Sequence, residues 1–349
     1  MAKVVIVGAG VMGSALTIPL ADNGHEINLW GTKYDQEVMR SIRKTRTHPC
    51  LGLALPGSLH LFALDELAHS VEEREIILLG VASGGIKSVM EMLGPFLKPG
   101  MVIVNVAKGL EEMGDGEIIT IPQVIARALP QQLRSHIPVV AIGGPSKARE
   151  VAQRVPTSVV FASSSVRAAQ RCRKIFTTPR YTVQVTSDVI GVEVGAALKN
   201  GYAIALGMCD GLKKREGVET MNNTKSTFFA QAAQEIALLS RMLGGRSSTV
   251  MGLAGVGDLY VTSAEGRNIT LGELIGSGLP AFQALEEMRK RRETVEGYPA
   301  IGIGYRLARK FEDSGKLRMN QLPLLKALWS ILYEDKPAHE VLFSLRLMA

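Results

Sequence analysis

Lys199 and Asn200 stand out in the segment GVEVGAALKNGYAIALGMCDGL, residues 191–212, which otherwise consists mainly of apolar residues and glycines. Lysine is seldom buried in a folded protein unless a partner stabilises its charge. Burial beside another cation lowers the pKa of a lysine, which lets the side chain exchange a proton near neutral pH. Lys199 is therefore a candidate for general acid–base catalysis. The alternative is a lysine that extends to solvent from a partly exposed helix face.

Three further segments carry polar residues in apolar or glycine-rich surroundings. They are NVAKGLE with Lys108, GGPSKAREVA with Ser146 and Glu150, and GLAGVGDLYVTSAEGRN with Asp258, Thr262, Arg267 and Asn268. The guanidinium of Arg267 offers a planar fork of N–H donors that suits a phosphate, and Asp258 could position an ammonium group. The alternatives are structural: Lys108 could cap a loop, Asp258 could cap a turn, and Arg267 could lie on the surface.

The N-terminal stretch VVIVGAGVMG contains the pattern GxGxxG at Gly8, Gly10 and Gly13. It follows an apolar run typical of a strand and opens a helical pattern, which is the context in which this motif binds dinucleotides. The glycines allow a tight turn, close approach to a pyrophosphate, and close packing of helix on strand. The N–H groups at the helix start would attract the phosphates. We therefore expect cofactor contacts from this stretch, including Val11 and Met12, rather than a ligand-free glycine turn.

The end of the second predicted strand bears on the choice between NAD and NADP. In NAD enzymes this strand usually ends with an acid that binds the ribose hydroxyls. Here it ends in Leu-Trp-Gly-Thr32-Lys33, and Asp35 follows slightly late. Thr32 and Lys33 could instead accept the 2′-phosphate of NADP, or both could be loop surface. The sequence slightly favours NADP and leaves NAD open.

Two kinds of structure must position these residues. Up to about residue 188, apolar β-branched runs alternate with helical patterns, with strands predicted within residues 3–10, 25–31, 74–83, 101–109, 137–146 and 157–164. Near-continuous apolar strands separated by helices indicate a parallel sheet covered on both faces. Beyond residue 188 the pattern is helical. We therefore predict an α/β Rossmann-type doubly wound domain over residues 1–188 and an all-α substrate-binding and catalytic domain over 189–349.

Length and composition agree with a two-domain globular protein. The 349 residues exceed one ordinary core, and 46% hydrophobic with 21% charged residues is a common mixture. No apolar run approaches the roughly 20 residues that a membrane helix needs, so we expect no membrane span. The N-terminus MAKVVIVGAG resembles a first strand more than a signal peptide.

Charge and cysteines narrow the partners further. The formal net charge of +7 raises nucleic-acid binding as a possibility. The basic residues are scattered without interleaved aromatics, however, so we expect no nucleic-acid partner and a mild attraction for an anionic substrate or cofactor. Cys50, Cys172 and Cys209 lie far apart with no His/Cys cluster, which argues against a metal site or disulfide framework. Reduced thiols favour a cytoplasmic location.

Taken together and in this order, the motifs resemble the NAD(P)-dependent glycerol-3-phosphate dehydrogenase family. The resemblance covers essentially the whole chain and extends to VEGYPA at residues 295–300 and to the tail ILYEDKPAHEVLFSL. It implies that NAD or NADP exchanges a hydride with a phosphorylated three-carbon substrate, interconverting sn-glycerol 3-phosphate and dihydroxyacetone phosphate. It also implies a homodimer formed through the helical domain, and a place in glycerol-3-phosphate metabolism and phospholipid biosynthesis.

The same resemblance implies a role for each candidate residue. The catalytic residues would be Lys199, Lys108 and Asp258. The substrate would contact Lys108, Lys199, Asn200, Asp258, Thr262, Arg267 and Asn268, with Arg267 and Asn268 at its phosphate. The cofactor residues would include Lys108, Ser146, Glu150, Arg267 and Glu296 besides those of the glycine motif and Thr32 and Lys33. We expect Lys199 to supply the proton for the substrate oxygen, in a cleft between the two domains and close to Lys108.

Departures from the family pattern bear on the substrate. Gln231 stands six residues after Lys225, where the family usually has arginine, and Ile269 follows Asn268 where a second arginine is common. A lost charged hydrogen bond costs about 1.5–3 kcal/mol if it touches the ligand. Two alternatives therefore stay open: a dehydrogenase of another polyol phosphate or hydroxy acid, and a non-catalytic nucleotide-binding homologue.

Overall fold

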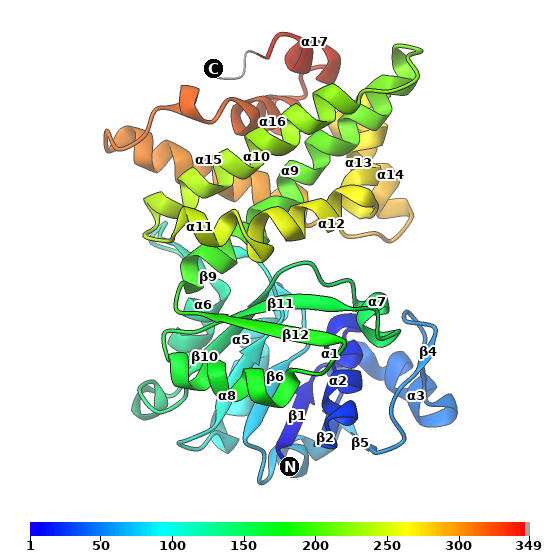
Figure 1. Ribbon diagram of the computed structural model, residues 1–349, viewed down its shortest axis with the longest axis vertical. Coiled ribbons are helices and arrows are strands. Elements are labelled where there is room, and N and C mark those ends of the chain that lie inside the picture. Colours follow the sequence, from blue (N-terminus) through cyan, green and yellow to red (C-terminus); the bar gives the residue numbers. More distant parts are fainter. Residues whose placement is uncertain (346–349) are drawn as a thin grey trace. The chain divides into compact units, whose positions relative to one another are not determined.

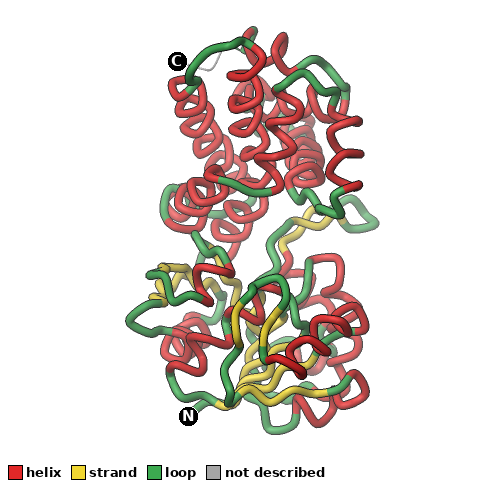
Figure 2. The backbone as a smooth tube through the Cα atoms, turned by 90° about the vertical axis from the view of Figure 1, so that its right-hand side faces the viewer, coloured by secondary structure: helices red, strands yellow, loops and turns green. Residues whose placement is uncertain are grey.

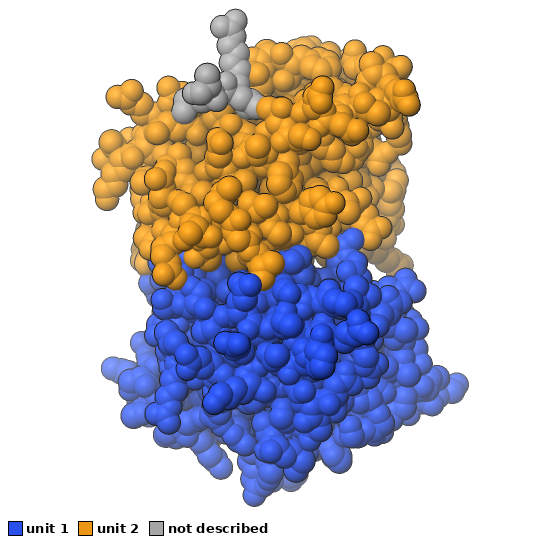
Figure 3. Space-filling view, in the orientation of Figure 1, with its two compact units in different colours: residues 1–108, 119–192 blue, residues 109–118, 193–349 orange. Residues whose placement is uncertain are grey.

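The computed structural model describes residues 1–345 (Figure 1). The chain forms two compact units, coloured separately in Figure 3. Unit 1 consists of Met1–Lys108 and Ile119–Val192, and unit 2 consists of Gly109–Ile118 and the chain from Glu193 onward. The division after Val192 lies close to the predicted boundary at residue 188. The segment 109–118, predicted within the first domain, groups instead with the helical unit.

Unit 1 is built on an eight-stranded sheet with the order β12-β11-β10-β7-β6-β1-β2-β5. From one edge to the other, the strands are β12 (Tyr181–Thr186), β11 (Thr157–Ala162), β10 (Val139–Gly143), β7 (Val102–Asn105), β6 (Ile76–Leu79), β1 (Lys3–Val7), β2 (Glu26–Trp30) and β5 (Leu59–Phe62). β6 and β7 are buried along their whole length, as expected for strands covered on both faces. The order β5-β2-β1-β6-β7-β10 is that of the Rossmann fold, which confirms the predicted fold class.

Two strands, β11 and β12, run antiparallel to the rest of the sheet, which departs from the predicted parallel arrangement. β11 pairs antiparallel with β10, whereas β12 pairs parallel with β11. The helix between β10 and β11, α7 (Ala148–Ala152), has only five residues and a length of about 7.5 Å. This helix is too short to carry the chain back to the level at which β10 begins. β11 therefore starts near the end of β10 and runs in the opposite direction.

Helices pack around the sheet (Figure 2). Besides α7, unit 1 contains α1 (Val11–Ala15), α2 (Thr17–Asp22), α3 (Gln36–Thr45), α4 (Leu67–Val71), α5 (Ile86–Leu93), α6 (Ile121–Ala128) and α8 (Val166–Phe176). A short ribbon, β3 (Thr47–His48) with β4 (Leu53–Ala54), follows α3. Gly24 adopts a φ of +69° just after α2, so it ends this helix as the sequence predicts.

As far as residue 345, unit 2 is helical except for its part of a short ribbon formed by β8 (Leu110–Glu112) and β9 (Ile118–Thr120). Its helices are α9 (Val189–Arg215), α10 (Asn222–Met242), α11 (Ser247–Val250), α12 (Asp258–Ala264), α13 (Arg267–Gly276), α14 (Ala281–Lys290), α15 (Gly297–Asp313), α16 (Pro323–Tyr333) and α17 (Ala338–Phe343). Glu112 pairs with Arg306 at 2.7 Å and with Lys310 at 3.7 Å, both on α15. These ion pairs give the physical reason why segment 109–118 belongs to unit 2.

The 27-residue helix α9 forms the core of unit 2. Within residues 1–345 it alone is long and apolar enough to cross a membrane by length and composition, although Glu193, Lys199 and Asp210 interrupt its apolar residues. The few polar residues, Lys199 and Asn200 among them, hardly lower the mean hydropathy of so long a helix. In the structure 89% of its most apolar window is buried inside the protein. A helix apolar on all sides and buried in this way is a core helix.

Candidate active site

The candidate cofactor residues of unit 1 gather after the carboxyl ends of its parallel strands. The glycine motif follows β1, Thr32 follows β2, Lys108 follows β7, and Ser146 follows β10. The strand order reverses between β1 and β6, and ligands of open α/β sheets bind beyond the strand ends at such a reversal. The topology therefore supports a dinucleotide at this edge.

The glycine motif forms a turn that only glycine can adopt. Gly8 has a φ of +98°, and a Cβ atom there would lie 2.4 Å from Val81 Cγ1. A Cβ atom on Gly10 would lie 2.2 Å from the carbonyl oxygen of Gly80, just after β6. Gly10 precedes α1, and within residues 1–345 no side chain caps the start of that helix. A helix start without a side-chain cap, here with Val11 and Met12 in its first turn, is the kind of site at which backbone N–H groups bind a pyrophosphate.

The end of β2 is organised by Asp35, which the short 3₁₀ turn Lys33–Asp35 brings back toward the strand. The Asp35 carboxylate accepts hydrogen bonds from the backbone N–H of Thr32 at 2.8 Å and from its hydroxyl at 2.7 Å. Thr32 is buried, whereas Lys33 is exposed and lies 5.1 Å from the centre of the Tyr34 ring. Of the two predicted phosphate ligands, Lys33 is thus the one that solvent can reach.

The remaining candidates of unit 1 lie on two loops. Asn105, at the end of β7, donates a hydrogen bond to Ala107 O at 2.7 Å and accepts one from Ala107 N at 3.1 Å, which braces the turn before the half-buried Lys108. The Ser146 hydroxyl contacts the Met12 sulfur at 3.8 Å, beside the glycine motif. Glu150 lies in the first turn of α7.

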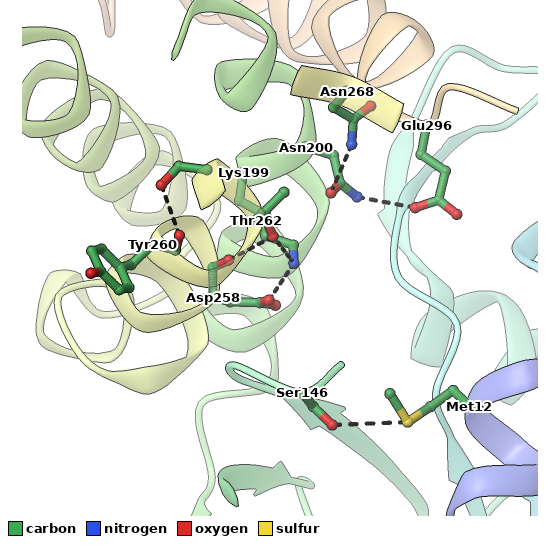
Figure 4. A network of polar contacts seen from close by, with 10 residues as sticks. Met12, Ser146, Lys199, Asn200, Asp258, Tyr260, Thr262, Asn268 and Glu296 are labelled. Atoms are coloured by element: carbon green, nitrogen blue, oxygen red, sulfur yellow. Dashed lines mark hydrogen bonds and ion pairs between the residues drawn. The ribbon is translucent and has the colours of Figure 1, made fainter. Parts of the chain in front are cut away.

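In unit 2, Lys199 is enclosed by two residues of α12 (Figure 4). Its ammonium group donates hydrogen bonds to the Asp258 carboxylate and, at 2.8 Å, to the Thr262 hydroxyl. The Thr262 hydroxyl in turn donates to the backbone carbonyl of Asp258 at 2.7 Å. Lys199 is 6% exposed and Asp258 1% exposed. The lysine therefore carries a paired charge in an almost closed setting, and the partly exposed surface alternative is wrong.

Asn200, the next residue of α9, leads a second cluster (Figure 4). Its side-chain amide donates to Glu296 at 3.1 Å, and its oxygen accepts from the Asn268 amide at 3.2 Å. Glu296 lies 3.6 Å from the Arg267 guanidinium, and both side chains are about half exposed. Three segments far apart in the sequence, residues 199–200, 258–268 and 296, thus meet along one turn of α9.

The backbones of α9 and α15 approach each other closely at this cluster. A Cβ atom on Gly297, the first residue of α15, would lie 2.3 Å from the Asn200 carbonyl oxygen. The Gly297 N–H donates to Asn268 Oδ1 at 2.9 Å. A π-helical turn over Leu253–Gly257 leads directly into α12 and Asp258, and such turns are frequent at functional sites.

The two departures from the family pattern lie in the interior of unit 2. The Gln231 amide donates to Glu235 at 2.8 Å, and Glu235 also accepts hydrogen bonds from Tyr202 and from the backbone at the start of α16. Ile269 is 7% exposed, and its backbone lies close to Gly207 of α9. Gln231 thus belongs to a buried polar network around Glu235.

The three cysteines differ in their exposure. Cys172 and Cys209 are buried, and burial raises the pKa of each thiol to about 12, whereas Cys50 is exposed. Within residues 1–345 no group of three or more His, Cys, Asp or Glu side chains could hold a metal ion.

Comparison with known families identifies both halves of the chain. The NAD-dependent glycerol-3-phosphate dehydrogenase N-terminus matches residues 3–169, and the C-terminus of the same family matches residues 188–343. The chain belongs to the NAD-dependent glycerol-3-phosphate dehydrogenase family. This membership confirms the resemblance inferred from the segment around Lys199 and from the segment GLAGVGDLYVTSAEGRN.

Individual relatives of this glycerol-3-phosphate dehydrogenase family agree along the whole chain. An NADP(+)-dependent glycerol-3-phosphate dehydrogenase of Archaeoglobus fulgidus is 43% identical over 97% of this chain and 98% of its own. A glycerol-3-phosphate dehydrogenase [NAD(P)+] of Geobacter metallireducens is 36% identical over 98% and 96%. The crystal structure of glycerol-3-phosphate dehydrogenase from Coxiella burnetii superimposes with a TM-score of 0.81 at 28% identity, covering 98% of each chain.

Proposed function

We propose that this protein interconverts sn-glycerol 3-phosphate and dihydroxyacetone phosphate with NAD or NADP, and that Lys199 exchanges the proton with the substrate oxygen. The observation that carries the proposal is the buried Lys199–Asp258–Thr262 cluster beside Asn200, Asn268 and Arg267. A proton-transfer group and a phosphate-binding group thus belong to one unit.

The proton step follows from the contacts of Lys199. When NAD(P) is bound, it supplies or takes up the hydride. Reduction of the ketone also requires a proton on the substrate oxygen, and we assign its donation to the Lys199 ammonium, which is hydrogen-bonded to the Asp258 carboxylate. Thr262 holds the same ammonium at 2.8 Å, so both partners fix its direction.

The substrate phosphate has a natural binding group in Arg267. Its guanidinium is half exposed and lies 3.6 Å from the Glu296 carboxylate, so its N–H donors can turn toward a phosphate. Asn268 and Asn200, hydrogen-bonded to each other, offer neutral amide groups to the rest of the molecule. We assign Lys108, Ser146, Glu150 and Glu296 to cofactor and substrate contacts on the family resemblance.

The proposal is tested by mixing the purified protein with dihydroxyacetone phosphate and following oxidation of NADH and NADPH in parallel. We expect turnover with at least one cofactor. The variant Lys199→Ala should lose about 10²–10⁴-fold in kcat, the range of general acid–base catalysis. A preference for another ketone, or cofactor binding without turnover, would contradict the proposed substrate.

The matched control is Lys225→Ala, which removes another lysine of unit 2 that is paired with an aspartate, Asp210, at 2.7 Å. It should keep its activity. Since Lys199→Ala leaves the buried Asp258 charge unpaired, about 3–5 kcal/mol of stability could be lost as well. Thermal unfolding and cofactor binding of the variant separate a lost fold from a lost proton donor.

We also propose a homodimer in the cytoplasm, on the family resemblance and the reduced state expected of the thiols. Light scattering coupled to gel filtration tests the dimer, since a monomeric mass would contradict it. Cell fractionation tests the location.

A further inference from the structure

The backbone of Ala9, between the first two glycines of the motif, is held at both of its polar groups. Its N–H donates to Asp35 Oδ2 at 3.2 Å. Its carbonyl oxygen lies 3.1 Å from His48 Nε2. Asp35 lies in the turn after β2 and His48 lies in β3. Two separate segments thus form hydrogen bonds with one residue of the turn that would face the pyrophosphate.

His48 has its ring fixed in one orientation and one tautomer. The side chain is 1% exposed, and the Leu51 N–H points to Nδ1 at 3.4 Å, which makes Nδ1 the acceptor. Nε2 then carries the proton and donates it to the Ala9 carbonyl. A buried imidazole of fixed orientation thus donates a hydrogen bond to the glycine turn. The sequence around it, TRTHPC, contains no motif that predicts this contact.

Asp35 uses one carboxylate oxygen for three donors. Oδ2 accepts the Thr32 N–H at 2.8 Å, the Thr32 hydroxyl at 2.7 Å and the Ala9 N–H at 3.2 Å. A carboxylate satisfied by several N–H and O–H groups of its own chain gives up these bonds if it turns to another ligand. The residue thus links the end of β2 to the glycine turn.

We propose that Asp35 and His48 are positioning residues that hold the dinucleotide-binding turn through Ala9, and that Asp35 does not serve as the acid for the adenosine ribose. This inference rests on the proposed binding of NAD(P). It separates two roles at the end of β2: Asp35 holds the turn for either cofactor, while the exposed Lys33 is the group that senses the 2′-phosphate of NADP.

The test measures the affinity of the protein for NADPH and NADH directly, by nucleotide fluorescence, with no substrate present. We expect Asp35→Ala and His48→Ala to weaken both nucleotides in parallel by 10-fold or more, leaving the NADPH/NADH ratio within about twofold of the wild type. Asp35→Asn, which keeps an acceptor oxygen, should recover part of the loss. Lys33→Ala should weaken NADPH alone.

The other outcomes overturn the inference. Loss of NADH alone in Asp35→Ala or Asp35→Asn would make Asp35 the ribose acid, and unchanged affinities in folded Asp35→Ala and His48→Ala would remove the positioning role. The exposed residues Asp65 and His60 supply the matched controls, Asp65→Asn and His60→Ala, and thermal unfolding checks each variant.

The same measurement separates this inference from the proposed reaction. A wild-type protein that binds neither nucleotide would overturn both. The expected pattern of affinities without any turnover of dihydroxyacetone phosphate would remove the proposed reaction and leave the positioning roles of Asp35 and His48 standing.

Discussion

Arg267 joins two parts of the proposed chemistry, because it is next to Asn268 in sequence and 3.6 Å from Glu296 in space. An ion pair between half-exposed side chains contributes little to stability, about 0–1 kcal/mol. The arginine is therefore held loosely in the absence of an anion, and a phosphate can replace the carboxylate as its partner. Its role should appear in substrate affinity rather than in folding.

We predict that Arg267→Ala lowers kcat/KM for dihydroxyacetone phosphate by about 10–100-fold, mainly through KM, because a charged hydrogen bond contributes about 1.5–3 kcal/mol. The comparison substrate is dihydroxyacetone, which lacks the phosphate and should lose little. Steady-state kinetics with both substrates check this.

The control variant for this residue is Arg289→Ala, which removes an exposed helix arginine paired with Glu286. It should leave both substrates unchanged. An equal loss with dihydroxyacetone and with its phosphate in Arg267→Ala would show that the arginine does not act on the phosphate.

Among the elements, the start of α15 determines how Glu296 and Asn268 meet α9. The helix begins at Gly297, whose missing side chain leaves room for the Asn200 carbonyl oxygen. A larger residue at this position would collide with the backbone oxygen of Asn200. This backbone atom cannot move aside unless α9 or α15 shifts.

Replacement of Gly297 by alanine should therefore destabilise unit 2 by about 1–3 kcal/mol, the usual range for an overpacked contact. Activity should fall as well, since Asn200 and Glu296 would no longer be placed to form their hydrogen bond. Chemical denaturation and the dehydrogenase assay measure the two effects. Gly114→Ala is the control, because nothing lies within 4 Å of a Cβ there; equal stability of the two variants would refute the packing argument.

At the scale of the whole molecule, the stability of unit 2 depends on a buried carboxyl group. Glu235 is 1% exposed and accepts hydrogen bonds from Gln231, Tyr202 and the backbone of Leu324 and Leu325. Burial raises its pKa from 4.5 to about 7, against the opposing effect of these four donors. The folded protein thus binds a proton that the unfolded chain has already released between these pH values.

We predict that this group makes the free energy of unfolding fall as pH rises from about 4.5 to about 7, by on the order of 3 kcal/mol, and contributes no further change above that range. Glu235→Gln cannot titrate, so the difference in stability between wild type and variant should follow the same curve. Denaturant unfolding of both proteins at several pH values measures it. A difference independent of pH would mean that Glu235 stays ionised in the fold.

Much of the fold could be predicted because it depends on local patterns. The apolar runs predict β1, β2, β6, β7, β10 and β11, and the glycine motif predicts the turn after β1. The antiparallel direction of β11 could not be predicted, because it depends on the shortness of α7. The ribbon at 109–118 joins unit 2 through ion pairs of Glu112 with Arg306 and Lys310, nearly two hundred residues further along the chain.

The sequence by itself determined an α/β domain followed by a helical one, and it supplied the candidate side chains for binding a dinucleotide, holding a phosphate and moving a proton, because residue type and local period are sufficient for these. Only the tertiary structure decided that Lys199 meets Asp258 and Thr262, residues 59 and 63 positions away, and that Asp35 and His48 hold Ala9 from 26 and 39 positions away. The physical reason is that such partners are brought together by the packing of helices and strands, which no local pattern of residues encodes.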